Sequence, residues 1–212
     1  MLDLSSMNAM HLDAIREIGN IGGGHAATAL SSLLGCQVRI EIPKAELVSI
    51  YELNSYYDDP DSSYAAVFAS SQHKDPYNFI LLVKESDVSK LIILLMYKQF
   101  KTKVDVASMS QEMVDSALGE IGNILLGSYL SAVNGFIGVS SGMTAPSVAH
   151  DTLASLLSVV SAMFGEFGDV ALVTKSNLIV GTGEGVNSIG ANILLASGPQ
   201  ALEALLTKLG IM

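Results

Sequence analysis

Hydrophobic residues recur at every third or fourth position in two long stretches of the chain, a spacing that is typical of amphipathic helices. The first predicted helix covers about Asn8 to Leu34, and Gly35 is expected to end it. The second opens with a capping-box pattern, Ser108 to Gln111, and runs to about Val133. We expect these two helices to be the longest elements of the fold.

Three consecutive glycines, Gly22 to Gly24, lie inside the first predicted helix. They could break the helix, or they could mark a place where another element packs too closely for side chains. The second stretch has Ile124 to Gly127 at the same place, a sequence that favours a helix. We therefore expect both helices to be continuous.

Shorter segments with alternating or continuous hydrophobic residues predict strands. In chain order these are 36–42, 64–70, 77–84, 137–143, 170–175, 178–181 and 189–196. Pro43 is expected to stop the first strand, and the fourth is expected to end near Pro146. Further helices are predicted over 87–97, 151–163 and 199–209, with Ser86 and Ser197 as the caps of the first and last.

The second half of the chain repeats the order of elements in the first half. The chain therefore reads as a single domain, 1–212, made of two pseudo-repeats, about 1–100 and 105–212. Strands follow one another closely within each half, which favours antiparallel pairing. Neither half has an obvious means of closing its own core. We predict an α/β (α+β) fold with pseudo-two-fold symmetry, in which helices flank one antiparallel sheet and the two long helices are exposed.

One pattern of polar residues occurs once in each long helix. A short polar residue is followed by Glu four positions later, by Asn three positions after that, and by a more distant Pro. The copies are Asp13, Glu17, Asn20 and Pro43, and Ser116, Glu120, Asn123 and Pro146. Corresponding residues are all 103 positions apart. Because positions i, i+4 and i+7 lie along one helix face, each helix should present a carboxylate and a carboxamide there and pack inward elsewhere.

A single Glu and Asn on a solvated helix face would say little about function. Here the Glu, the Asn, the glycines beside them and the downstream proline recur in register, while the two halves differ at many other positions. Shared ancestry of the halves accounts for part of this repetition. The register of the polar residues nevertheless favours a functional site in each half.

The composition narrows the classes of function. Half of the 212 residues are hydrophobic and 15% are charged, which argues against disorder. No apolar run reaches the roughly 18 residues of a membrane span, so no membrane insertion is expected. The start of the chain lacks the features of a signal peptide, and Cys36 alone permits no intrachain disulfide; both observations favour a cytoplasmic protein. The net charge of −10 argues against nucleic acid as a partner.

Other kinds of site are less well supported. His11 and His25 flank Glu17, but they are 14 positions apart, about 21 Å along a helix, which is too far to share a metal ion. The glycines after Asn20 lack the lysine and the preceding strand of a phosphate-binding loop. No local motif suggests a catalytic triad. We therefore expect no metal site.

The repeated pattern resembles the signature of the CheC/CheX/FliY family of chemotaxis phosphatases: Asp or Ser, three residues, Glu, two residues, Asn, twenty-two residues, Pro. The chain meets this signature twice, and the resemblance covers nearly its whole length. It implies an enzyme that hydrolyses the phospho-aspartate of a CheY-like response regulator in two-component signalling. It also implies an antiparallel sheet with exposed motif helices, and the receptor deamidase CheD as a second partner.

The resemblance also implies roles for the motif residues. Asn20 and Asn123 would orient the attacking water, while Glu17 and Glu120 would pair with the active-site lysine of the regulator. The remaining four would support the motif: Asp13, Pro43, Ser116 and Pro146. A carboxamide suits the task because its oxygen accepts a hydrogen bond from water while its NH₂ donates another. No cofactor of the protein's own is expected, since the regulator's active site supplies Mg²⁺.

Two classes of function stay open at this point. One is the phosphatase, and the other is a non-catalytic docking module for a response regulator or CheD in chemotaxis adaptation. For CheD the resemblance suggests the helix around 151–157. A third class, a structural component of a flagellar switch, predicts stable assembly without dependence on phosphorylation.

Overall fold

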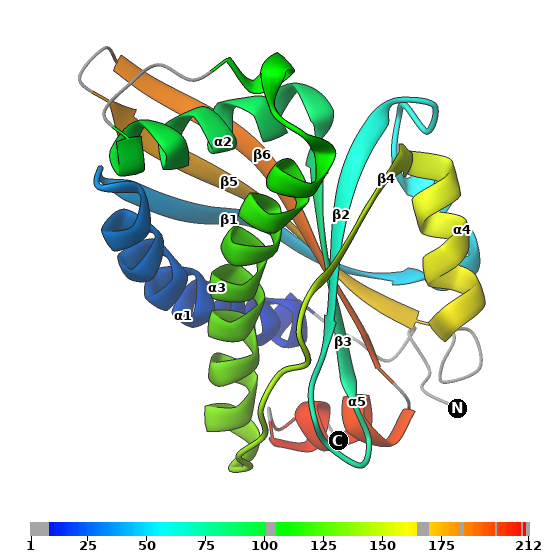
Figure 1. Cartoon of the computed structure of the whole chain (residues 1–212). Coiled ribbons are helices and arrows are strands. Elements are labelled where there is room, and N and C mark those ends of the chain that lie inside the picture. The colour runs from blue at the N-terminus through cyan, green and yellow to red at the C-terminus, as the bar shows by residue number, and fades with distance from the viewer. Residues whose placement is uncertain are drawn as a thin grey trace.

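The computed structural model describes residues 9–100, 105–164, 170–182, 185–197, 199–208 and 210. The chain folds into one six-stranded sheet with helices on both faces (Figure 1). The elements are α1 (Ala9–Leu34), β1 (Val38–Ser49), the 3-10 helix η2 (Ile50–Tyr56), β2 (Ser63–Ser70), β3 (Tyr77–Lys84), α2 (Glu85–Phe100), the 3-10 helix η3 (Val106–Ser108), α3 (Gln111–Ile137), β4 (Ser147–Thr152), α4 (Leu153–Phe164), β5 (Val170–Thr182), β6 (Gly185–Ser197) and α5 (Pro199–Lys208).

The order of the strands interlocks the two halves of the chain. The order is β1-β5-β6-β3-β2-β4, and every neighbouring pair is antiparallel. Each outer strand pairs with a strand of the other half, β1 with β5 and β4 with β2, while β3 and β6 join the halves at the centre. Exchanging the halves reverses the order and leaves the pairing unchanged. The predicted antiparallel sheet with pseudo-two-fold symmetry and flanking helices is confirmed.

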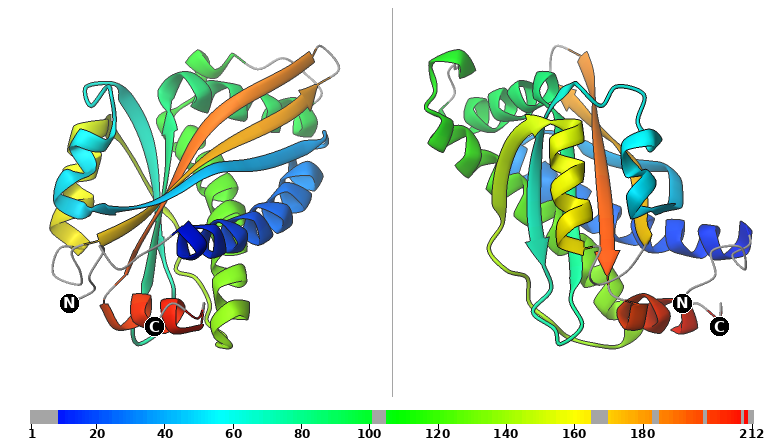
Figure 2. Two further views of the ribbon diagram at one scale, coloured as in Figure 1. Left: turned by 180° about the vertical axis from the view of Figure 1, so that it is seen from behind. Right: turned by 90° about the vertical axis from the view of Figure 1, so that its right-hand side faces the viewer.

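The two faces of the sheet carry separate hydrophobic cores. Phe79 and Leu81 of β3 join the core formed with α1, α2, α3 and α5. Ile80 and Leu82, the alternate residues of the same strand, join the core under η2 and α4. Figure 2 shows α4 and the motif helices α1 and α3 on opposite sides of the sheet. Side-chain alternation along the central strands therefore decides which helices each strand supports.

The sequence predicted that Pro43 and Pro146 each lie at the end of a strand, and this prediction is wrong for both. β1 continues through Pro43, and its pairing with β5 shifts register between Glu41 and Lys44. A proline can be accommodated here because β1 is an edge strand and an irregularity interrupts its pairing. Pro146 lies before β4 instead of after a strand, so the strand predicted over 137–143 is wrong. That segment begins at the end of α3, where Gly138 adopts a left-handed conformation with a φ of 74°.

Several other predicted boundaries are wrong. Segments 170–175 and 178–181 belong to one strand, β5. α2 begins at Glu85, so Ser86 lies inside the helix, and Ser197 is the last residue of β6. α3 is capped by Ser110 instead of opening at Ser108, since the Ser110 hydroxyl accepts a hydrogen bond from the Met113 amide. Residue 209, placed in the last helix by the sequence, lies outside the described residues.

Gly22, the first glycine of the run in α1, lies where this helix packs against α3. α1 is continuous from Ala9 to Leu34, as predicted. A Cβ atom added at Gly22 would lie 3.0 Å from Tyr129 Cα and 3.4 Å from Ala132 Cβ of α3. Of the two explanations for the glycines, close packing is therefore the correct one at Gly22.

Tyr129 should make the protein sensitive to alkali. Its ring is 5% exposed, and its hydroxyl makes no hydrogen bond of good geometry with the described residues. Burial raises the pKa of Tyr129 from 10.0 to about 12, although the nearby Ser176 hydroxyl lowers it. The folded state therefore retains a proton that the unfolded chain releases above about pH 10, and folding stability falls as the pH rises further.

We expect Tyr129→Phe to reduce this fall by up to about 1.4 kcal/mol per pH unit between the two pKa values. Urea unfolding of wild type and Tyr129→Phe at about pH 9 and about pH 11 measures the difference. If the free energy of unfolding falls equally in both proteins, the buried phenol does not contribute as described.

Candidate functional site

The structure places both copies of the motif on the outer faces of α1 and α3. The side chains of Glu17, Asn20, Glu120 and Asn123 are all exposed. Asp13 and Ser116, one turn before each Glu, are exposed as well. Five apolar residues between them are buried and join the core on the sheet side, namely Ile15, Ile18, Ala117, Leu118 and Ile121. Each helix thus packs on one face and presents its polar stripe to solvent on another.

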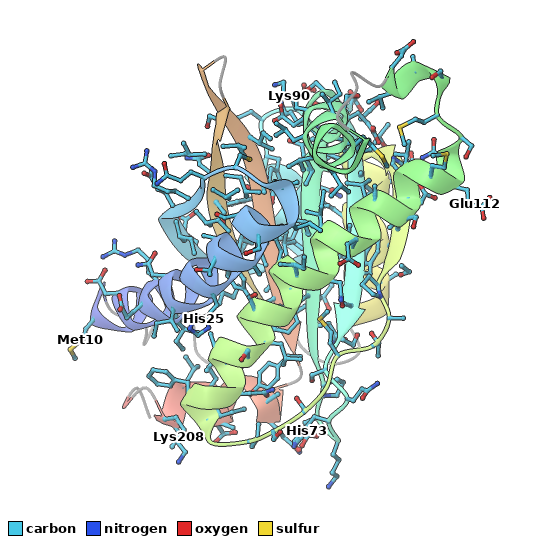
Figure 3. All side chains as sticks on the ribbon, turned by 60° about the vertical axis from the view of Figure 1, so that its left-hand side comes forward. Met10, His25, His73, Lys90, Glu112 and Lys208 are labelled. Atoms are coloured by element: carbon cyan, nitrogen blue, oxygen red, sulfur yellow. The ribbon has the colours of Figure 1, made fainter. Side chains whose placement is uncertain are left out.

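The two motif helices lie on the same side of the sheet. α1 and α3 pack against each other there, and Gly22 of α1 lies next to Tyr129 of α3. In Figure 3 both helices face the viewer, with Met10 and His25 marking α1 and Glu112 marking the beginning of α3. The two motifs are therefore accessible from one side of the molecule.

The glycine before each motif asparagine seats the helix on the sheet. A Cβ atom added at Gly122 would lie 2.6 Å from Cγ1 of Val67 in β2. At Gly19 it would lie 3.0 Å from Cδ1 of Ile42, the residue of β1 that precedes Pro43. These contacts fix the height of each helix above the sheet beside Asn20 and Asn123. The repetition of these glycines is visible in the sequence, but their contacts with the sheet are not.

The polar groups of the motif are free to meet a partner. Within the part of the chain that the structure describes, the carboxylates of Glu17 and Glu120 make no ion pair or hydrogen bond. The same holds for the carboxamides of Asn20 and Asn123. Since no internal contact has to be broken, a docking protein could engage these groups directly.

The prolines lie on the two outer strands or beside them. Pro43 is part of β1, at the irregularity in its pairing with β5. Pro146 precedes β4, in a segment held to β2 because the Thr144 amide donates to the Ser70 carbonyl at 2.8 Å. Both prolines therefore mark the edges of the sheet and not the exposed stripe, which fits a supporting role.

The two copies differ in charge. Arg16 Nη2 lies 2.9 Å from Asp13 Oδ1, so a cation lies beside Glu17 in the first motif. The corresponding position of the second motif is Gly119, and α3 contains no Lys, Arg or His. A partner therefore meets a mixed charge on α1 and only acidic groups on α3.

Two hollows of similar size contain none of the eight motif residues. One, of about 430 Å³, lies between the turn after β2, the end of α3 and α5. The other, of about 460 Å³, is lined by the second half of α3 and the segment that follows it. Among the described residues, no group of three or more His, Cys, Asp or Glu side chains could hold a metal ion. In the same residues no helix is both long and apolar enough to cross a membrane. An exposed polar stripe without a pocket suits recognition of a macromolecule better than that of a small molecule.

Comparison with known proteins finds a family model that matches both motif segments and relatives that match most of the chain. Segments 10–47 and 113–150 match the model of the CheC-like family, and each contains one complete motif. The CheY-P phosphatase CheC of Bacillus subtilis (strain 168) is 28% identical over 168 residues, which is 79% of each protein. The flagellar motor switch phosphatase FliY of the same organism is 28% identical over 147 residues, or 69% of this chain and 33% of FliY.

Solved structures share the fold. The structure of Thermotoga maritima FliY aligns with a TM-score of 0.74 and 19% identity, covering 96% of this chain and 98% of that one. A chain of the FliG-FliM complex from H. pylori aligns with a TM-score of 0.64 and 15% identity, covering 95% of this chain and 100% of that one. The interlocked sheet is therefore an architecture that these proteins have in common.

Proposed function

Both halves of the chain carry a CheC-like segment, and from this we propose that the protein is a phosphatase acting on the phospho-aspartate of a CheY-like response regulator. One observation carries the proposal: each segment presents its Glu and Asn exposed and unpaired on a long helix. The similarity to a CheY-P phosphatase along 79% of the chain supports it.

Hydrolysis of an acyl phosphate requires only a small contribution from the catalyst. An acyl phosphate is already reactive, so water attacks phosphorus, the bond to the aspartate oxygen breaks, and the products are inorganic phosphate and the free carboxylate. The catalyst has to hold the water in line with that bond. The carboxamide of Asn20 or Asn123 can do so, since its oxygen accepts from the water and its NH₂ donates to a neighbouring oxygen. Glutamine orients water in a comparable way in GTPases.

The glutamates would set the register of docking. Glu17 lies three residues before Asn20, and Glu120 lies three residues before Asn123, so each pair shares one helix face. A carboxylate on that face can pair with the active-site lysine of the regulator, and this contact would bring the asparagine to the phosphoryl group. Mg²⁺ belongs to the regulator in this scheme, where it offsets phosphoryl charge.

The test is the decay of a phosphorylated CheY-like regulator with Mg²⁺, with and without this protein. With the protein well below the regulator concentration, we expect faster decay over many turnovers, because a catalyst is released after each hydrolysis. Unchanged decay together with binding of the phosphorylated regulator would overturn the proposal and leave a docking module. The binding of CheD remains a prediction from the sequence.

A further inference from the structure

Arg16 is a cation that the first motif has and the second lacks. It directly precedes Glu17 in α1, and its Nη2 atom lies 2.9 Å from Oδ1 of Asp13, one turn earlier. The residue 103 positions after Arg16 is Gly119, and the residue 103 positions after Asp13 is Ser116. The second motif therefore lacks both members of this ion pair.

Arg16 borders the exposed stripe of its helix. It lies three residues after Asp13 and four residues before Asn20, and side chains at these spacings are neighbours on a helix surface. The side chains of Arg16 and Asp13 are 47% and 63% exposed. A protein that docks on the stripe therefore meets Arg16 at the edge of the contact.

The pair with Asp13 orients the arginine along the helix. Because the guanidinium contacts the carboxylate one turn earlier, it is directed away from Asn20, which lies one turn later. A guanidinium has several N–H donors in a planar fork, so donors beyond the contact with Asp13 remain for a partner. Arg16 is thus placed to bind a carboxylate at the edge of the docking surface, and not the phosphoryl group that reacts beside Asn20.

The corresponding surface of α3 has no cation of its own. This helix contains three acidic residues, Glu112, Asp115 and Glu120, and no Lys, Arg or His. Apart from the helix's own backbone, no atom of the described residues lies within 4 Å of a Cβ added at Gly119, so the fold leaves room for a side chain there. An acidic group that approaches α3 is therefore repelled by its carboxylates, whereas on α1 it meets Arg16.

We propose that Arg16 is a specificity-determining residue of the first motif, which favours a regulator with a carboxylate at the rim of its active site. The inference rests on the proposed function. Proteins hold Mg²⁺ with carboxylates, so acidic side chains surround the site that each motif has to reach. Arg16 attracts such a group while Glu17 pairs with the lysine, and α3 has no counterpart. The two motifs therefore bind the same acidic regulator with different strength.

The activity test isolates the first motif with Asn123→Ala. In this background Arg16→Gln should raise KM for the phosphorylated regulator about fivefold at about 0.05 M salt and leave kcat unchanged. Arg16→Lys keeps the charge and should keep KM close to that of the parent. The effect of Arg16→Gln should fade at about 0.5 M salt, because charges at the rim are screened there. An unchanged KM, or a loss confined to kcat, would overturn the inference.

The second motif offers the reciprocal experiment. In an Asn20→Ala background, Ser116→Asp with Gly119→Arg copies the ion pair onto α3 and should lower KM about fivefold at low salt. Ser116→Asp with Gly119→Gln is the matched control, because Gln and Arg have similar helix propensity and differ in charge. An equal KM in these two variants would show that the charge is not the cause.

Binding tests the same residue without any activity. Glu120→Lys blocks the second motif by placing a like charge before the regulator's lysine. The remaining motif should bind a regulator that carries Mg²⁺ and a beryllofluoride mimic of the phosphoryl group, and Arg16→Gln should weaken this binding about fivefold at low salt. If binding weakens but neither motif accelerates decay, the proposed phosphatase function fails while the role of Arg16 stands. If binding is the same with and without Arg16, the inference fails whether or not the regulator is hydrolysed.

Discussion

Replacing both Asn20 and Asn123 by alanine is expected to return the decay of the regulator's acyl phosphate to the rate of the regulator alone. The two carboxamides are exposed and have no partner among the described residues, so their loss removes no internal contact. If they orient the attacking water, the double variant loses the whole rate acceleration that this orientation provides, about 100-fold or roughly 2.7 kcal/mol. The decay of phosphorylated regulator with Mg²⁺ measures it.

Two controls make this result specific. Asn54 is an exposed asparagine in η2, away from α1 and α3, and Asn54→Ala should leave the rate unchanged. Binding of the phosphorylated regulator should be kept in the double variant, because Glu17 and Glu120 are still present. Full activity in the double variant would show that hydrolysis does not depend on these asparagines. The two single variants then show how much of the hydrolysis rate depends on each motif.

Gly122→Ala is expected to destabilise the protein by about 2 kcal/mol, which is the range found for overpacked cores. Its Cβ atom would lie 2.6 Å from Cγ1 and 3.1 Å from Cβ of Val67, which is 1% exposed in the middle of the sheet. Val67 has a short, stiff side chain and cannot move away, so either α3 or β2 must shift. Urea unfolding measures the loss in the free energy of unfolding, provided that the m-value is the same in both proteins.

The same helices supply matched controls. Gly119 lies three residues earlier on α3, and apart from the helix's own backbone no atom of the described residues lies within 4 Å of its added Cβ, so Gly119→Ala should stabilise the helix by up to about 1 kcal/mol. Gly19→Ala should cost less than Gly122→Ala, because its one close contact among the described residues is with the flexible end of Ile42 at 3.0 Å. Combining Gly122→Ala with Val67→Ala should cost less than the sum of the two changes. Strict additivity would show that the contact with Val67 is not the cause.

The parts of the fold that depend on local spacing could be predicted from the sequence. The three-to-four-residue period identified α1 and α3, and the short alternating runs identified β2 and β3 within one residue of their observed starts. The repeated spacing of Glu and Asn was enough to place both motif stripes on one face of each helix. These features depend on residues that are neighbours along the chain.

Features that depend on distant residues could not be predicted. Nothing local indicates that β1 pairs with β5 and β4 with β2, because that choice depends on how the two halves share one core. Pro43 was read as a stop, but an edge strand with an irregularity tolerates it. His150 is 35 residues from Asp115 and 65 from Glu85 along the chain, so no local pattern indicates that their side chains meet.

The most direct test of the central claim is a structure of this protein bound to a CheY-like regulator that carries Mg²⁺ and a beryllofluoride mimic of the phosphoryl group. We expect α1 or α3 to lie against the regulator's active site. Asn20 or Asn123 should hydrogen-bond to a water in line with the mimic, and Glu17 or Glu120 should contact the active-site lysine. A regulator docked on α4, or one whose active site faces neither asparagine, would contradict the account.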